Sequence, residues 1–74
     1  MQPADKRPAY QQRVIEEKRE LDDRYYKLEA FIQKTIVFAS LPQEEQSNMF
    51  AQLRAMGQYS EVLGKRIARF GGAA

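Results

Sequence analysis

Residues 14–32, VIEEKRELDDRYYKLEAFI, and residues 49–70, MFAQLRAMGQYSEVLGKRIARF, decide the fold of this chain. In each stretch, mostly apolar residues recur at alternating spacings of four and three, which is the spacing of one face of an α-helix. The first line consists of Val14, Lys18, Leu21, Tyr25, Leu28 and Ile32, and the second of Met49, Leu53, Met56, Ser60, Leu63, Ile67 and Phe70. The sequence therefore predicts an all-α protein with two amphipathic helices.

A short connection between the two helices makes them antiparallel neighbours, so we expect a helical hairpin. Residues 1–74 form a single domain in this prediction: an N-terminal arm over 1–8, helix one over 9–36, helix two over 41–70 and a tail over 71–74. Two helices bury one face each, and a domain of this size has a thin margin of stability. We therefore expect the hairpin to assemble into a homo-oligomer.

The segment between the two helices is poor helix material. Thr35–Phe38 is a β-branched and aromatic run, and we expect it to be the frayed or bent end of helix one, packed by Ile36 and Phe38. Ser40 and Gln43 have the spacing of a capping box. The sequence therefore predicts that the Ser40 side chain caps the start of helix two.

Composition excludes several classes of chemistry. The 74 residues contain no cysteine and no histidine, which removes disulfides, thiolate nucleophiles and the commonest general base and zinc ligand. Adjacent carboxylates such as Glu16 and Glu17 point about 100° apart on a helix and do not converge on one site. We expect no enzymatic activity, no metal and no cofactor.

We expect no targeting signal in this sequence. No stretch approaches the roughly 20 apolar residues of a membrane span, and Met1–Arg7 has no apolar core of a signal peptide. We expect a soluble, cytoplasmic protein without a membrane partner. With 12 basic and 10 acidic side chains the net charge is +2, which is too balanced to indicate binding of polymeric nucleic acid.

Positive charge is concentrated near the end of the chain. From Ala51 onward, Glu61 is the one acidic side chain, against the four basic residues Arg54, Lys65, Arg66 and Arg69. These cations complement the dipole of helix two, or they form a seat for an anionic ligand or for the acidic face of another subunit.

Three residues in the helices fit less simply. Lys18 occupies a seam position, where it either extends its ammonium to solvent or meets an acidic side chain or a ligand. Gly57 and Gly64 are seven residues apart in helix two and share a face. They are either tolerated surface glycines or positions that another backbone or a ligand approaches closely, and we favour the second interpretation.

Helix one combines aromatic and basic side chains, which suit nucleotide ligands. Tyrosine rings stack on nucleobases, and lysine and arginine bind phosphate. The residues concerned are Tyr10, Arg13, Tyr25, Tyr26, Lys27 and Lys34.

Several runs of this sequence resemble the small phage anti-CBASS sponges, which bind cyclic oligonucleotides. The runs are Tyr10–Asp23 (YQQRVIEEKRELDD), Lys27–Ile32 (KLEAFI), Leu41-Pro42, Gln52–Met56 (QLRAM) and Tyr59–Ile67 (YSEVLGKRI). The resemblance extends over about residues 10–70. It implies a helical protein that forms a hexamer and sequesters cyclic dinucleotides, without cleaving them, in pockets between protomers.

The resemblance also implies site residues. In that family a tyrosine, a lysine of the first helix and an arginine late in the second helix contact the dinucleotide; the matching residues here are Tyr10, Lys27 and Arg66, with Arg24 or Lys18 as alternatives to the lysine. Some members hold cyclic trinucleotides at a separate site on the symmetry axis, for which Arg13, Lys34 and Thr35 are the candidates here.

Two other functions compete with the sponge. The same apolar lines could assemble a structural or adaptor protein that needs no small ligand. A basic helical dimer could bind nucleic acid, but the near-neutral charge of helix one argues against this.

Overall fold

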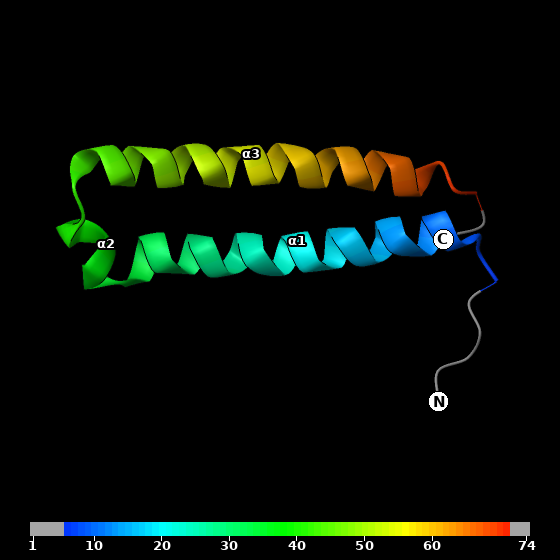
Figure 1. The fold of residues 1–74 in the computed structure, drawn as a ribbon, viewed down its shortest axis with the longest axis horizontal. Coiled ribbons are helices and arrows are strands. Elements are labelled where there is room, and N and C mark those ends of the chain that lie inside the picture. The colour runs from blue at the N-terminus through cyan, green and yellow to red at the C-terminus, as the bar shows by residue number, and fades with distance from the viewer. Residues whose placement is uncertain (1–5, 72–74) are drawn as a thin grey trace, which may run out of the picture.

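The computed structural model describes residues 6–71 and consists of two long helices joined by a short one. Helix α1 spans Ala9–Lys34, α2 spans Ile36–Ser40 and α3 spans Gln43–Ala68. The two long helices lie side by side and antiparallel, with α2 at the turn (Figure 1). The predicted all-helical hairpin is confirmed. Residues 1–5 and 72–74, which include most of the predicted arm and tail, lie outside the described part of the chain.

The core is the predicted seam between α1 and α3. Leu63 is 1% exposed, and it packs with Val14 and Leu21, which are 6% and 8% exposed. Met56, Ile67 and Phe70 pack against these three residues and are partly buried. The remaining seam positions are half-buried, because a two-helix layer covers each helix on one side only.

The turn differs from the sequence-based prediction. Thr35 adopts extended backbone angles, and its Oγ1 accepts a hydrogen bond from the Phe38 backbone nitrogen at 3.2 Å, so Thr35 caps α2. This break rotates the following residues relative to α1. Phe38 is 8% exposed, as expected, but Ile36 is 86% exposed, so the prediction that Ile36 packs is wrong.

The predicted capping box is also wrong. Ser40 is the last residue of α2, and its hydroxyl donates to the Val37 carbonyl at 2.7 Å. Helix α3 starts after Pro42, and no side chain caps it. The Gln46 amide closes the turn instead, since its Nε2 donates to the Leu41 carbonyl at 2.9 Å. Helices α1 and α3 are each slightly shorter than the two predicted helices, over 9–36 and 41–70.

The two glycines of α3 face α1. A Cβ atom on Gly57 would lie 3.3 Å from Cε2 of Tyr25, and a Cβ atom on Gly64 would lie 3.4 Å from Cε of Lys18. The glycines therefore admit side chains of the neighbouring helix. This is a close approach, as the shared face indicated, but the approaching groups are side chains of the same chain.

Candidate functional site

The open end of the hairpin brings together the start of α1 and the end of α3. Here Tyr10, Gln11, Arg66, Arg69 and Phe70 line an open groove of ≈ 310 Å³. The antiparallel arrangement produces this juxtaposition, because it places the first turn of one long helix beside the last turn of the other (Figure 1). We call this set of residues the end groove.

The end groove has one aromatic wall and two cations. The ring of Tyr10 meets the ring of Phe70 edge-on, with centroids 5.9 Å apart, and Tyr10 remains 51% exposed. Arg66 lies in the last turn of α3, and Arg69 is its C-cap residue. The first turn of α1 contains no acidic residue to neutralise these guanidinium groups. The end groove can therefore offer a flat ring and positive charge to the same ligand.

The structure brings together two of the three residues that the family resemblance assigned to a dinucleotide. Tyr10 and Arg66 share the end groove. Lys27 lies seventeen residues after Tyr10 on the same helix, which places it about 25 Å away along the axis. Its ammonium pairs with Asp23 at 2.9 Å, and its side chain is 76% exposed. Lys27 can reach a ligand in the end groove only from another copy of the chain.

The other candidates are dispersed over the hairpin. Arg13 and Arg24 are exposed on α1, and Lys34 is exposed in its last turn. Thr35 uses its hydroxyl in the fold, because Oγ1 also donates to the Phe31 carbonyl at 2.7 Å. Arg13 and Lys34 are 21 residues apart on α1, which is about 30 Å along the axis, so one groove of a protomer cannot unite them.

Lys18 belongs to a polar cluster in the seam. Its ammonium donates to Asp22 Oδ2 at 2.7 Å and to Ser60 Oγ at 3.0 Å, and the Ser60 hydroxyl donates to the other carboxylate oxygen of Asp22. The cluster therefore crosses from α1 to α3. Of the interpretations of Lys18 left open by the sequence, the structure supports a partner of opposite charge.

The same cluster lowers the pKa of the Asp22 carboxyl below its ordinary value of 3.8. The largest cause is the hydrogen bond from Lys18, and the second is the hydrogen bond from Ser60. Partial burial raises the pKa, and the charge of Lys18 lowers it further. A carboxylate with a lowered pKa stabilises the folded state above its unfolded-state pKa, and the contribution is lost as the pH falls through its folded-state pKa.

We therefore expect Asp22→Asn to lower the free energy of unfolding at pH 7 by about 1 kcal/mol or less, because the pair is only partly buried. The difference from the wild type should shrink in acid, below about pH 4. Urea unfolding at several pH values measures it. Asp23→Asn is the matched control, since Asp23 and its partner Lys27 are 63% and 76% exposed; an equal effect of both variants would contradict a special role for the seam cluster.

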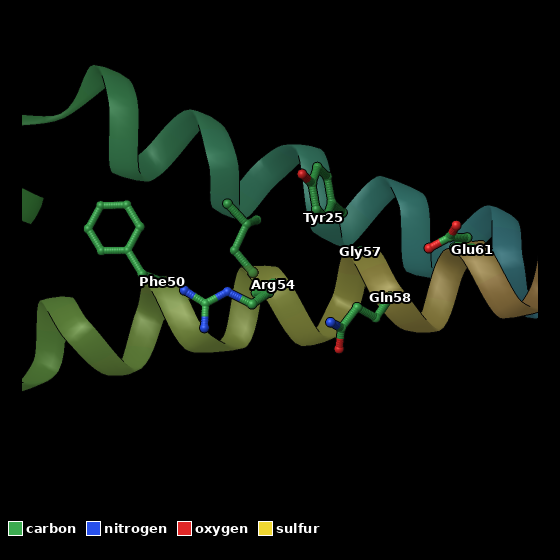
Figure 2. Close-up of a pocket in the computed structure, with 7 residues that line it drawn as sticks. Tyr25, Phe50, Arg54, Gly57, Gln58 and Glu61 are labelled. Carbon is green, nitrogen blue, oxygen red and sulfur yellow. The ribbon is translucent and has the colours of Figure 1, made fainter.

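A second groove lies along the middle of the hairpin. It has a volume of ≈ 470 Å³ and is lined by Tyr25 of α1 and by Phe50, Leu53, Arg54, Gly57, Gln58 and Glu61 of α3. Figure 2 shows the α3 side chains projecting on both sides of Gly57, with Tyr25 above it. We call this the middle groove.

Sequence reasoning missed parts of both grooves. Arg69 was visible as one cation of the basic C-terminal turn, and Phe70 as a seam residue. Gln11 and Gln58 gave no signal, because an exposed glutamine in a helix is common and neutral. Phe50 lies outside the predicted seam, and only the fold shows that it lines the middle groove.

Two further features were sought in the described residues, a metal-binding cluster and a membrane-spanning helix. Over residues 6–71, no three acidic side chains gather closely enough to hold a metal ion. No helix in the same range combines the length and apolar character needed to cross a membrane.

The fold and the end groove define the class: a small helical-hairpin protein with an open, cationic and aromatic groove. The model of the Sequestin family matches residues 8–69, so this chain belongs to the Sequestin family. The family name indicates a sequestering function. Neither the curated proteins nor the solved structures contain a match to the chain.

Proposed function

We propose that this protein is a phage sponge that binds a cyclic oligonucleotide second messenger, a cyclic dinucleotide such as cyclic GMP-AMP in the first instance, and does not cleave it. It acts in the cytoplasm of the infected bacterium and blocks CBASS signalling by lowering the free concentration of the messenger. The observation that carries the proposal is the end groove, where an exposed tyrosine ring and two arginines meet in a member of the Sequestin family.

The chemistry of the ligand matches that of the end groove. A cyclic dinucleotide presents two phosphates and two bases, so its capture needs cations and flat apolar surface. Arg66 and Arg69 supply the first, and Tyr10 supplies the second. No bond is broken, which agrees with a chain that has neither cysteine nor histidine.

One protomer leaves the groove open, so we propose that a further copy completes the site. The groove volume of ≈ 310 Å³ lies at the lower end of the range for small-molecule pockets. We expect Lys27 of a neighbouring copy to be the cation that closes the end groove. The copies would belong to a homo-oligomer, which the family resemblance implies is a hexamer. A sponge works by mass action, and a Kd near 1 nM corresponds to about −12 kcal/mol.

The decisive experiment combines calorimetry and sedimentation with a panel of cyclic di- and trinucleotides. We expect Tyr10→Ala to weaken dinucleotide binding by about 1–3 kcal/mol, the value of one stacked base, and Lys27→Ala to weaken it as well. Neither variant should change the oligomeric state. The controls are Tyr59→Ala, which removes a tyrosine of α3 that is 46% exposed outside the end groove, and Arg19→Ala, which removes an exposed cation paired with Glu16.

The panel also tests the identity of the ligand. It should include cyclic ADP-ribose, which carries two phosphates but a single base. If the protein binds only that compound, the proposed sequestering function stands, but the proposal that the ligand is a cyclic dinucleotide is wrong. Unchanged affinity in both Tyr10→Ala and Lys27→Ala would overturn the site.

The alternative function is a non-enzymatic helical adaptor or structural phage protein. The exposed apolar residues at the turn favour it, because Ile36, Val37 and Phe50 are 86%, 56% and 49% exposed. In this case every nucleotide of the panel would leave the melting temperature unchanged at concentrations well above micromolar. A ligand at 100 times its Kd adds about 2.7 kcal/mol to the stability of a folded protein, so the two functions give clearly different results.

A further inference from the structure

The α3 side of the middle groove is built on a seven-residue repeat. Phe50, Gly57 and Gly64 are spaced by seven, and so are Arg54 and Glu61. Seven residues are close to two turns of an α-helix, so each set stays on one side of α3. Figure 2 shows Phe50, Arg54 and Glu61 along the same stretch of helix, on both sides of Gly57. This surface carries an aromatic ring and a cation before Gly57 and a carboxylate after it.

The two charges on this surface have no partner in the described chain. Within residues 6–71, neither Arg54 nor Glu61 takes part in an ion pair. They also do not pair with each other across the seven residues, about 10 Å along the axis, that separate them. Both side chains are exposed, so each is free to pair with an opposite charge from outside the protomer.

The order of the residues is self-complementary. Arg54 is three residues before Gly57, and Glu61 is three residues after Gln58. Consider a second α3 that runs antiparallel to the first and is related to it by a two-fold axis beside the Gly57–Gln58 bond. This axis places Arg54 of each helix opposite Glu61 of the other. Phe50 lies seven residues before Gly57, and Lys65 lies seven residues after Gln58, so the same axis places Phe50 of one helix opposite Lys65 of the other. An ammonium group over an aromatic ring is a favourable contact.

We propose that this face of α3 is a contact with a second copy of the chain, related by a two-fold axis at Gly57–Gln58 and held by two symmetric Arg54–Glu61 ion pairs. At Gly57 the ring of Tyr25 occupies the space of the missing side chain, with its Cε2 3.3 Å from the position of a Cβ atom, so the Gln58 side chain of the second copy meets the Tyr25 ring there. Phe50 is 49% exposed in the single hairpin, and the contact covers this residue. The pairing does not depend on the nucleotide.

Charge reversal tests the pairing, with sedimentation velocity at low salt and without nucleotide. In Arg54→Glu, an acidic group faces an acidic group at both symmetric positions of the contact. In Glu61→Arg, a basic group faces a basic group at both positions. We expect each variant to raise the dissociation constant for self-association at least about tenfold. A one-to-one mixture of the two variants should associate again as a heterodimeric pair, and the double variant Arg54→Glu/Glu61→Arg should associate with itself.

Controls separate the contact from the fold and from ligand binding. Arg19→Glu makes the same change of charge at an exposed position of α1 and should leave association unchanged. Helical content measured by circular dichroism shows that each variant is folded. The proposal is overturned if the wild type is monomeric, if the single variants associate like the wild type, or if folded single variants fail to associate when mixed. Failure of nucleotide binding overturns the sponge and leaves this result intact.

Discussion

Replacing Leu63 with alanine is expected to lower the free energy of unfolding by about 2–5 kcal/mol, the range for removal of a fully buried leucine side chain. Leu63 is 1% exposed and stands at the centre of the core, against Val14 and Leu21 of α1. The loss combines the transfer of the side chain with the cavity that remains. For a small domain this is a large part of a total that is usually 5–15 kcal/mol.

Urea unfolding followed by circular dichroism measures this loss. The protein concentration must be the same for every variant, because self-association adds to the apparent stability. Val62→Ala is the matched control, since Val62 is the neighbouring residue on α3 and is 52% exposed. We expect it to change stability by less than about 0.5 kcal/mol. Equal losses for the two variants would show that Leu63 does not hold the two helices together.

The seam could be predicted from the sequence because helix periodicity is a local property. An apolar residue every three or four positions defines one face of a helix whatever lies opposite. Val14, Leu21 and Leu63 are accordingly buried where the spacing placed them. The sequence also predicted that Lys18 and Ser60 lie in the seam, although not that Asp22 joins them across it.

The turn could not be predicted in the same way. Periodicity assigns a face only while the helix is continuous, and the extended backbone at Thr35 interrupts it. The residues that follow are rotated, so Phe38 turns inward and Ile36 outward. Ser40 had the correct spacing for a cap, but α2 incorporates it into its last turn. The choice between these outcomes depends on tertiary packing of Phe38 against the rings of Phe31 and Phe50.

The family resemblance selected Tyr10 and Arg66 as candidate site residues, and the hairpin explains why the two lie in one groove. Antiparallel helices place the first turn of α1 beside the last turn of α3, which brings Tyr10 to Arg66. Lys27 cannot join them in one protomer, because α1 is a continuous helix that holds the two positions about 25 Å apart. A site that needs Lys27 therefore requires an assembly, and the arrangement of copies is not encoded in the period of either helix.

Replacing Arg66 with glutamine is expected to weaken binding of the cyclic dinucleotide by about 10- to 100-fold. Glutamine keeps a polar side chain that can donate hydrogen bonds but removes the charge that the phosphates require. A hydrogen bond to a charged group contributes about 1.5–3 kcal/mol, and each 1.4 kcal/mol is a factor of ten in affinity. Arg66 lines the end groove beside Tyr10, so its loss affects ligand and not the seam. Isothermal calorimetry at fixed salt measures the change.

Arg19→Gln is the control for this variant, because it removes the same charge at an exposed position that pairs with Glu16. We expect it to leave the affinity within about twofold of the wild type, since exposed charges separated by more than a Debye length of about 10 Å are largely screened. Arg69→Gln provides a second test, as Arg69 lines the same groove and should also weaken binding. If Arg66→Gln and Arg69→Gln both bind as tightly as Arg19→Gln, the phosphates lie elsewhere, and the end groove is not the site at which the messenger is sequestered.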